Sequence, residues 1–230
     1  MTLSSETNET LVVATTNRGK LAELRALLAT LPLRVRSADE VMGHPMRLVE
    51  DGTTFAENAL KKARAVAVAT RALTLADDSG LEVDALGGRP GVRSARFAHE
   101  SASDAENNAA LLAALQSLGQ RLAAPFGSSP LFPARFRCVL ALVDPLESGR
   151  EPMTVEGVCE GALTLRPRGA AGFGYDSLFV VSRPNEPEKT MAELSEEEKN
   201  RVSHRAVALG ALRPVLLRVL SVRGATKHRR

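Results

Sequence analysis

The order of apolar and polar segments along the chain predicts an α/β protein with a mixed β-sheet. In the first half, short apolar runs at 11–14 and 72–76 alternate with segments whose apolar residues recur at helical spacing. In the middle, two strand-like runs, 136–143 and 153–164, follow one another. Alternation favours parallel strands, whereas consecutive strands favour a hairpin or meander. The sheet is therefore expected to be mixed, and not doubly wound throughout.

The first α/β unit follows a polar N-terminal segment. LVVA at 11–14 is bounded by polar residues and predicts a strand. KLAELRALLATL at 20–31 repeats leucine at helical spacing and predicts a helix. LRVRS at 33–37 is the next candidate strand. Residues 38–53 contain glycine and proline and are expected to form a loop.

A second helix and strand lead to an acidic stretch. TFAENALKKARAVAVAT at 54–70 predicts a helix, and Thr54 with Glu57 forms a capping box at its start. Residues 72–76 predict a buried strand that ends in the sequence ADDSG. The glycine-rich residues 80–97 are expected to form a long loop or a short ribbon.

The second half is expected to carry two further capped helices and a long final helix. Ser103 with Glu106, and Ser195 with Glu198, are capping boxes. HRAVALGALRPVLLRVL at 204–220 predicts the last helix. Between these boxes, GFGYDSLFVV joins a glycine-rich turn to a strand.

Composition is typical of a globular protein in a reducing compartment. Apolar residues make up 44% of the 230 residues and charged residues 25%, whereas aromatic residues make up only 3%. Cys138 and Cys159 lie in apolar, strand-like runs without metal-ligand spacing, so they are expected to be buried thiols. The N-terminus lacks the pattern of a signal peptide, and no apolar run approaches the ~20 residues of a membrane span. The protein is expected to be cytoplasmic.

Both ends and one internal segment are expected to lie outside the folded core. Residues 1–10 are expected to be a disordered tail, 11–222 a single domain and 223–230 a solvated basic tail. That last segment carries four basic residues, more than the net charge of +3, so it is weak support for nucleic-acid binding. Neither a nucleic-acid polymer nor a membrane is an expected partner. The Pro-rich residues 124–134 are expected to form a surface loop.

ATTNRGK, residues 14–20, joins the first strand to the first helix. Backbone N–H groups at a helix N-terminus bind phosphate, and Lys20 would add a positive charge. The spacing is neither that of a Walker A loop nor that of GxGxxG. On local grounds the favoured alternative is an ordinary turn with Asn17 as the N-cap.

Two carboxylates, Glu50 and Asp51, precede a glycine turn and the second helix. Glu57, Lys61 and Lys62 follow on that helix. One interpretation gives Glu57 to the capping box and the lysines to a solvated face. That interpretation leaves Glu50 and Asp51 unexplained.

Asp77 and Asp78 stand side by side in ADDSG. Ligand sites of open α/β sheets lie at the carboxyl ends of strands, where this pair is expected. Adjacent strand residues face opposite ways, so the two carboxylates are expected to differ in role. One would bind a divalent cation such as Mg²⁺ or activate water, and the other would orient a neighbour. An Asx turn that closes the strand explains the pair equally well.

The sequence GFGYD holds the only tyrosine, Tyr175, in a turn flanked by glycines. Glycine lets a backbone approach a ligand closely, so Phe173 is a candidate to stack on a base and Asp176 to read a base edge. The alternative is a bulged strand with Phe173 in the core. His204 and Arg205, at a helix start, are candidates to bind a carbonyl or a phosphate, although an ordinary surface helix start is the simpler interpretation.

Six segments occur in the order seen in one enzyme family. They are ATTNRGKLAELRALL, EDGTTFAENALKKA, ADDSGLEVDALGGRPGVRSARF, GFGYDSLF, KTMAELSEEEK and SHRAVAL. Together they resemble the inosine triphosphate pyrophosphatase (Ham1-like) family over residues 11–220. Each segment alone is modest, whereas six in order are very specific.

The resemblance implies a two-lobed α/β fold with a long central mixed sheet, flanking helices and an active-site cleft between the lobes. It implies a homodimer with one Mg²⁺ per subunit. It further implies hydrolysis of ITP, dITP and XTP to the monophosphate and pyrophosphate, which removes deaminated purines from the nucleotide pool.

The resemblance also assigns roles to residues. Asp78 would ligate the metal and activate water, and Glu50 would help to hold Mg²⁺. Asp77 stays open as the base, and Glu57 as the metal ligand. The residues assigned to the substrate are Thr15, Thr16, Asn17, Arg18, Gly19 and Lys20 at the triphosphate, Ser79 and Lys189 at the nucleotide, Phe173, Gly174, Tyr175 and Asp176 at the purine, and His204 and Arg205 at the base.

Two other functions are compatible with part of this pattern. A pyrophosphatase for modified pyrimidine triphosphates would keep the fold, but His204, Arg205 and the GFGYD turn argue against it. A nucleotide-binding regulator without turnover could lose Glu50, Asp78 or Lys20 freely, so the presence of all three argues against it.

Overall fold

The computed structural model describes residues 9–119, 131–147, 151–184 and 186–227. The chain forms two compact units, and each unit is assembled from segments that are distant in the sequence. Unit 1 takes in Met1–Asp78, Val139–Gly157 and Arg205–Arg230, and unit 2 takes in Ser79–Cys138 and Val158–His204. The cleft expected between two lobes stays a prediction.

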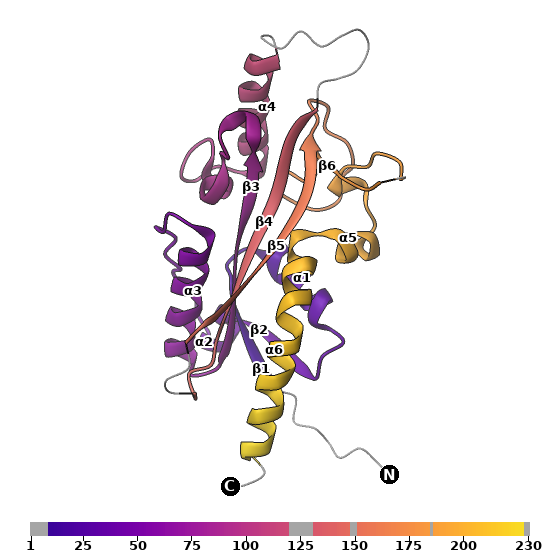
Figure 1. Cartoon of the computed structure of the whole chain (residues 1–230). Helices are drawn as coiled ribbons and strands as arrows, with labels where there is room; N and C mark the ends of the chain where they lie inside the picture. The colour runs from indigo at the N-terminus through magenta and orange to yellow at the C-terminus, as the bar shows by residue number, and fades with distance from the viewer. Residues whose placement is uncertain (1–8, 120–130, 148–150, 185, 228–230) are drawn as a thin grey trace. The chain divides into compact units, whose positions relative to one another are not determined.

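The described strands form one mixed six-stranded sheet, which confirms the predicted fold class (Figure 1). Its order is β2-β1-β3-β4-β5-β6. β1 is parallel to β2 and β3, whereas β5 and β6 are antiparallel. The strands are β1 Glu9–Ala14, β2 Leu33–Ser37, β3 Leu73–Val83, β4 Phe132–Val143, β5 Met153–Leu163 and β6 Phe179–Val181.

The capping boxes predicted at Thr54, Ser103 and Ser195 are confirmed. In each, the hydroxyl accepts a hydrogen bond from the backbone N–H three residues later, and the glutamate there accepts one from the cap N–H. The described helices are α1 Arg18–Leu28, α2 Ala38–Met42, α3 Phe55–Thr70, α4 Asp104–Gly119, α5 Glu196–Val202 and α6 His204–Lys227, with 3₁₀ helices η1 Asp84–Leu86, η2 Gly91–Arg96 and η3 Met191–Glu193.

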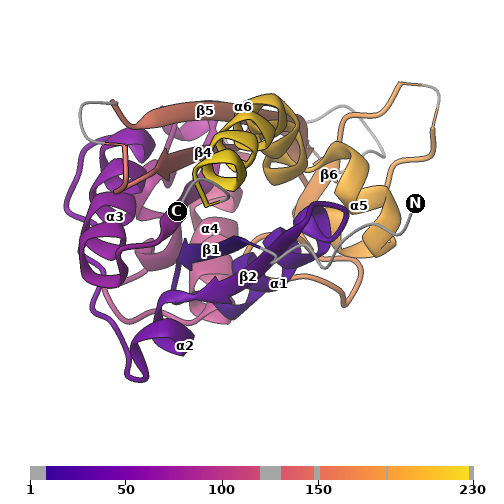
Figure 2. The same ribbon diagram turned by 90° about the horizontal axis from the view of Figure 1, so that it is seen from below.

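The predicted N-terminal boundary is two residues too late. β1 begins at Glu9, which pairs in register with Leu33 of β2. Figure 2 shows β1 and β2 side by side. The last two residues of the predicted tail therefore belong to the sheet, because β2 offers them a parallel partner.

The predicted loop at 38–53 begins with a short helix, so that prediction is wrong for its first five residues. Ser37 and Glu40 form a capping box at the start of α2, and Gly43 ends the helix in the left-handed conformation, with φ at 77°. Both signals are present in the sequence.

The strand that carries Asp77 and Asp78 does not end at this pair. β3 continues to Val83, so the Asx turn is wrong, and of the two alternatives for 80–97 the loop is wrong for residues 80–83. An antiparallel bridge between Glu82 and Pro90 agrees with the short ribbon. The parallel pairing of β3 with β1 stops at Ala76, opposite Ala14, the last residue of β1. β3 stays extended past this point because β4 is its neighbour on the other side. The two carboxylates thus lie where β1 ends.

The predicted surface loop at 124–134 is wrong for its last three residues. β4 begins at Phe132, and Phe132 and Ala134 are buried on either side of the exposed Pro133. This alternation gives a half-buried strand. Residues 124–130 lie outside the described residues.

The predicted basic tail is helical as far as Lys227, where α6 ends, and residues 228–230 lie outside the described residues. Arg223 donates from Nε to Glu9 at 3.0 Å and from Nη1 to Asp144 at 2.5 Å. Its side chain is 10% exposed. The expectation of a solvated side chain is wrong for Arg223, since two carboxylates hold it.

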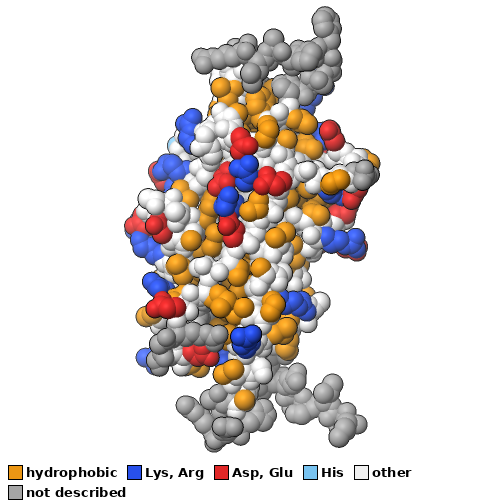
Figure 3. All heavy atoms as spheres, in the orientation of Figure 1, with side chains coloured by type: hydrophobic (Ala, Val, Ile, Leu, Met, Phe, Trp, Pro, Cys, Tyr) orange, Lys and Arg blue, Asp and Glu red, His pale blue; other side chains and the backbone are white. Residues whose placement is uncertain are grey.

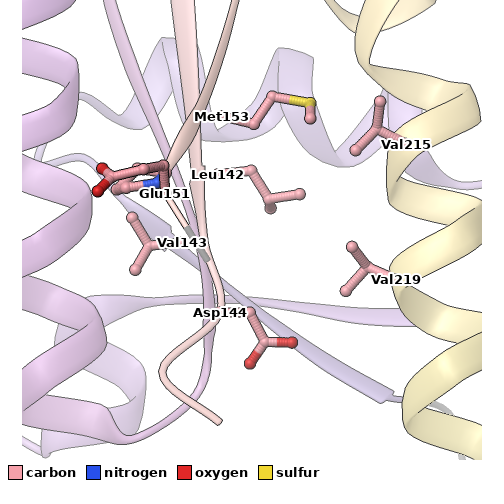
Figure 4. Close-up of a pocket in the computed structure, with 8 residues that line it drawn as sticks. Leu142, Val143, Asp144, Glu151, Met153, Val215 and Val219 are labelled. Carbon is pink, nitrogen blue, oxygen red and sulfur yellow. The ribbon is translucent and has the colours of Figure 1, made fainter. Parts of the chain in front are cut away.

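Apolar side chains face the turns of α6 that precede Arg223. Figure 4 shows Leu142 and Met153 directed toward Val215 and Val219 of α6. A small cavity of about 30 Å³ remains between these side chains, room for about one water molecule. These apolar side chains therefore face α6 one turn before Arg223.

Each unit has its own aliphatic core. In unit 1, Leu11–Ala14 of β1 are fully buried, and α3 packs against β1 (Figure 1). In unit 2, one cluster joins β3, α4, β4, β5 and β6. Its buried members include Leu81, Val83, Leu111, Leu115, Phe132, Leu163, Leu178 and Phe179. Cys138 and Cys159 are buried free thiols, as predicted.

One exposed part of the sheet in unit 2 carries charges of both signs (Figure 3). Arg135 lies within 4 Å of Glu82, Asp84 and Glu160, and Arg137 pairs with Glu82. These cross-strand pairs do not form a surface of a single sign. None of the helices in the described ranges combines the length and hydropathy of a membrane span.

Candidate active site

Asp77 is fully buried in β3 between two cations. Lys20 Nζ is 2.8 Å from one carboxylate oxygen, and Arg205 Nε is 3.1 Å from the other. Burial raises the pKa of Asp77, but the two cations outweigh it, so the pKa of this carboxyl lies well below its ordinary value. Asp77 is therefore a fixed anion and a poor acceptor for a proton.

Arg205 extends this cluster to α1. Its Nη1 donates to Glu23 at 2.6 Å, and its side chain is 4% exposed. Charges alternate in sign from Glu23 through Arg205 and Asp77 to Lys20, which offsets the cost of burying them. The guanidinium assigned to base recognition is thus committed to two carboxylates of unit 1, whereas His204 belongs to unit 2.

Asp78 has a different environment from its neighbour. Lys62 Nζ lies 2.9 Å from Oδ1, and Asn58 Nδ2 donates to Oδ2 at 3.2 Å. Burial raises the pKa of Asp78 and outweighs the opposing charge of Lys62, so the pKa lies above its ordinary value of 3.8. A higher pKa makes this carboxylate the stronger base, as proton transfer from water requires.

Lys62 brings Glu50 to the same point. The Lys62 ammonium contacts the Glu50 carboxylate and donates to the Asp77 carbonyl at 2.7 Å. Burial lowers the pKa of Lys62, but Asp78 and Glu50 outweigh it, so the pKa is raised and the ammonium stays charged. The carboxylates of Glu50 and Asp78 therefore converge on one cationic group.

This pair of carboxylates fits a hard divalent cation. Mg²⁺ commonly takes one or two carboxylates and completes its shell with water and substrate phosphates. Among the described residues, no three His, Cys, Asp or Glu side chains form a metal-ligand group. Glu57 is occupied in its capping box, where it accepts from the N–H groups of Thr53 at 2.7 Å and Thr54 at 3.2 Å. Of Glu50 and Glu57, the geometry favours Glu50.

The β1–α1 loop combines both interpretations of ATTNRGK. Asn17 is the N-cap of α1 and accepts from the Lys20 N–H at 3.0 Å, as the local interpretation predicts. Thr15 is buried, and its hydroxyl accepts from the Asn17 N–H at 3.1 Å. The loop also lines an open groove of about 610 Å³ in unit 1. Thr16, Asn17 and Arg18 are exposed, whereas Gly19 and Lys20 are half-buried.

In unit 2, the GFGYD turn presents a half-buried Phe173. Asp176 accepts from the Phe173 N–H at 3.2 Å and from Lys199 Nζ at 2.6 Å. The same ammonium lies 5.5 Å from the centroid of the Phe173 ring. Gly172, with φ at 83°, has no room for a side chain, because a Cβ would meet the Asp176 carboxylate at 2.1 Å. Asp176 thus shapes the turn.

Gly174 and Tyr175 are held by other segments of unit 2. The Gly174 N–H donates to Asp104 at 2.7 Å, and its carbonyl accepts from Asn108 Nδ2 at 2.8 Å. Tyr175 is buried, and its hydroxyl donates to the Ser94 carbonyl at 2.8 Å. Burial raises the pKa of the Tyr175 phenol. Tyr175 is therefore an anchor of the turn rather than an exposed contact.

Three more predicted residues lie in unit 2. Lys189 is half-buried, with its Nζ 2.9 Å from Glu198. His204 is buried and stacks on Phe136, with ring centroids 4.9 Å apart. Ser79 follows Asp78 in β3 and is half-buried.

Sequence reasoning missed the central role of Lys62 and Asn58. They lie four residues apart on α3, on the face that buries Phe55, Ala59 and Ala63. Polar residues on the apolar face of a predicted helix indicate a buried polar site, so this pattern could have identified both residues from the sequence. Lys61, one position earlier, lies on the exposed face.

Comparisons with known proteins agree with this fold. A model of the Ham1 family matches residues 11–215. A dITP/XTP pyrophosphatase of Geobacter sulfurreducens is 49% identical over 203 residues, which cover 88% of this chain and 94% of that protein. A dITP/XTP pyrophosphatase of Bacillus subtilis is 44% identical over 205 residues, covering 89% and 96%. The solved structure of a HAM1 protein from Coxiella burnetii matches with a TM-score of 0.74 at 40% identity, covering 91% and 99%.

The mixed sheet, with buried carboxylates and lysines where β1 ends, defines an α/β protein with a candidate ligand site at the carboxyl end of a parallel strand. The chain belongs to the Ham1 family, which confirms the resemblance found in its six motifs.

Proposed function

We propose that this protein is a nucleoside triphosphate pyrophosphatase that converts ITP, dITP and XTP to the monophosphate and pyrophosphate. Relatives named dITP/XTP pyrophosphatase, such as that of G. sulfurreducens at 49% identity, support the substrate class. The biological role proposed is removal of deaminated purines before they enter DNA or RNA.

The observation that carries the proposal is the contrast between two adjacent carboxylates. Asp77 is held as an anion by Lys20 and Arg205, whereas the pKa of Asp78 is raised by burial. Two neighbouring carboxylates whose pKa values are shifted in opposite directions are typical of catalytic sites. Asp78 is accordingly the proposed general base.

In the proposed reaction, water attacks the α-phosphorus and transfers a proton to the Asp78 carboxylate. The bond from that phosphorus to the α–β bridging oxygen breaks, and pyrophosphate leaves with the electron pair. Lys62 and Asn58 each donate to one Asp78 oxygen, so they fix its orientation. Lys20 and the N-terminal N–H groups of α1 would bind the phosphates.

Glu50 and Asp78 would hold Mg²⁺, the cofactor proposed for this site. When bound, the cation offsets negative charge on the phosphates. The Lys62 ammonium, which both carboxylates contact, marks where positive charge is already favoured.

Phe173 would stack on the purine. Hypoxanthine and xanthine carry a 6-oxo group, which accepts hydrogen bonds, whereas the 6-amino group of adenine donates them. The Lys199 ammonium, which also binds Asp176, lies 5.5 Å from the centroid of the Phe173 ring and would offer a donor that an amino group cannot pair with. Such a mismatch leaves a polar group unpaired and discriminates strongly.

We also propose that the protein is a homodimer and that it is located in the cytoplasm. The two buried free thiols are consistent with a reducing compartment.

The test incubates the purified protein with Mg²⁺ and ITP, with ATP, GTP and a modified pyrimidine triphosphate in parallel, and identifies products by phosphorus NMR. IMP and pyrophosphate, formed much faster from ITP than from ATP, are expected. IDP and phosphate would contradict the reaction. Faster turnover of the pyrimidine would contradict the substrate class, and ITP binding without turnover would leave a regulator.

A further inference from the structure

We propose that Asp104 and Asn108 of α4 are positioning residues that hold the Phe173 ring for nucleotide binding. The inference rests on the proposed function, because it assigns Phe173 to the purine. Asp104 accepts from the Gly174 N–H at 2.7 Å, and Asn108 donates to the Gly174 carbonyl at 2.8 Å. The two residues lie one helical turn apart, so both bind the backbone of Gly174, its N–H and its carbonyl, from one side of α4.

The turn needs such support because Phe173 lies between two glycines. Gly172 and Gly174 have φ at 83° and 60°, values that glycine adopts easily and leaves easily. Fixing one residue of backbone costs conformational entropy. Hydrogen bonds to both sides of Gly174 offset that cost before a nucleotide arrives.

The capping box at the start of α4 does not include Asp104. Ser103 is the N-cap, and Glu106 closes the box by accepting from the Ser103 N–H at 2.7 Å. The Asp104 carboxylate is thus available to bind Gly174, which lies 70 positions later in the chain. This separation of roles supplies a matched control within one helical turn.

Asn107, between the two proposed residues, holds a second segment. It accepts from the Ala98 N–H at 3.0 Å and donates to the Ala95 carbonyl at 3.1 Å. The neighbouring Ser94 carbonyl accepts from the Tyr175 hydroxyl. The first two turns of α4 therefore fix the Phe173 turn directly, and the segment that anchors Tyr175 as well.

Steady-state kinetics with ITP test the proposal. Asp104→Ala should raise KM about tenfold with little change in kcat, because the turn loses a charged hydrogen bond. Asp104→Asn keeps an acceptor oxygen and should stay within about threefold of the parent KM. Glu106→Ala weakens the same helix start without touching Gly174, so its KM should not change.

A tryptophan at position 173 gives a readout that does not depend on catalysis. The chain has no tryptophan, so Phe173→Trp introduces a single reporter. Asp104→Ala in that background should lower the fluorescence anisotropy of the reporter, whereas Glu106→Ala should not. Equal KM and anisotropy for these two variants would overturn the proposal. If ITP proved not to be a substrate, the anisotropy would still decide whether Asp104 positions residue 173.

Discussion

The charge cluster of unit 1 and the Phe173 turn of unit 2 are held in opposite ways. In unit 1, charged side chains hold one another, and Lys62 lies between the carboxylates of Glu50 and Asp78. In unit 2, side chains of α4 hold a backbone, that of Gly174. A group that transfers protons needs a controlled charge, whereas an aromatic surface needs only a fixed shape. The two regions should therefore fail differently when mutated.

Asp78→Asn should have the largest effect. It keeps the shape of the side chain and removes the proton acceptor, so kcat for ITP should fall about 10³-fold. Asp51→Asn is the control, since Asp51 is exposed and pairs at the surface with Lys61. Pyrophosphate release measures both. A near-parental kcat for Asp78→Asn would show that Asp78 of unit 1 is not the proton acceptor.

Lys62→Met should destabilise the fold as well as reduce turnover. It leaves Asp78 and Glu50 without their shared cation, and breaking a buried ion pair costs about 3–5 kcal/mol. Lys61→Met, one position away on the exposed face, should cost less than about 1 kcal/mol. Urea unfolding compares the two. Equal loss in both variants would show that the Lys62 charge is not needed to hold the cluster.

Phe173→Leu should raise KM for ITP and leave kcat nearly unchanged. Stacking on a base is worth about 1–3 kcal/mol, which corresponds to a rise in KM of roughly fivefold to 150-fold. Phe173→Tyr keeps the aromatic face and should retain a near-parental KM. A fall in kcat without a rise in KM would show that Phe173 acts in the chemical step and not in binding. That result would contradict the proposed difference between the two regions.

Arg223→Gln tests whether the ion pairs of Arg223, which lie outside the charge cluster, stabilise unit 1. It removes the contacts with Glu9 and Asp144 and should lower the free energy of unfolding by about 1–2 kcal/mol. Arg218→Gln, at an exposed position of the same helix, is the control. Equal thermal midpoints for the two variants would show that the ion pairs of Arg223 do not stabilise the fold.

Protonation of Glu198 at low pH should slightly destabilise unit 2. Hydrogen bonds from Ser195, with Lys189 adding to them, lower its pKa from 4.5 to about 2. A depressed folded-state pKa contributes stability above the unfolded value, and this is lost as pH falls from about 4.5 toward 2. Glu198→Gln should therefore flatten the fall of the thermal midpoint over that range. Glu188→Gln, which removes an exposed carboxylate, should keep the parental slope.

Local patterns predicted most of the fold. The bounds of β2 and the capping box of α3 follow from short-range spacing alone, and both are confirmed. β3 was predicted too short because ADDSG resembles a turn, whereas a neighbouring strand keeps it extended. The C-terminal helix was predicted too short because the partners of Arg223 are distant in sequence.

The residue types of the charge cluster were predictable, but their partners were not. Strand alternation predicts that Asp77 and Asp78 differ in role, but only the fold brings Lys20 and Arg205 to one and Lys62 to the other. A pKa depends on such neighbours and on burial, which no local pattern encodes. The roles of Asp78 and Glu50 stay predictions until activity is measured.

Single-turnover hydrolysis of saturating ITP by Asp78→Asn and Phe173→Leu tests the central claim most directly. Saturation removes the effect of weakened binding, so only the chemical step is compared. Phe173→Leu should react at close to the parental rate, and Asp78→Asn about 10³-fold more slowly. Equal rates for the two variants, or a parental rate for Asp78→Asn, would contradict the assignment of chemistry to the buried carboxylate of unit 1.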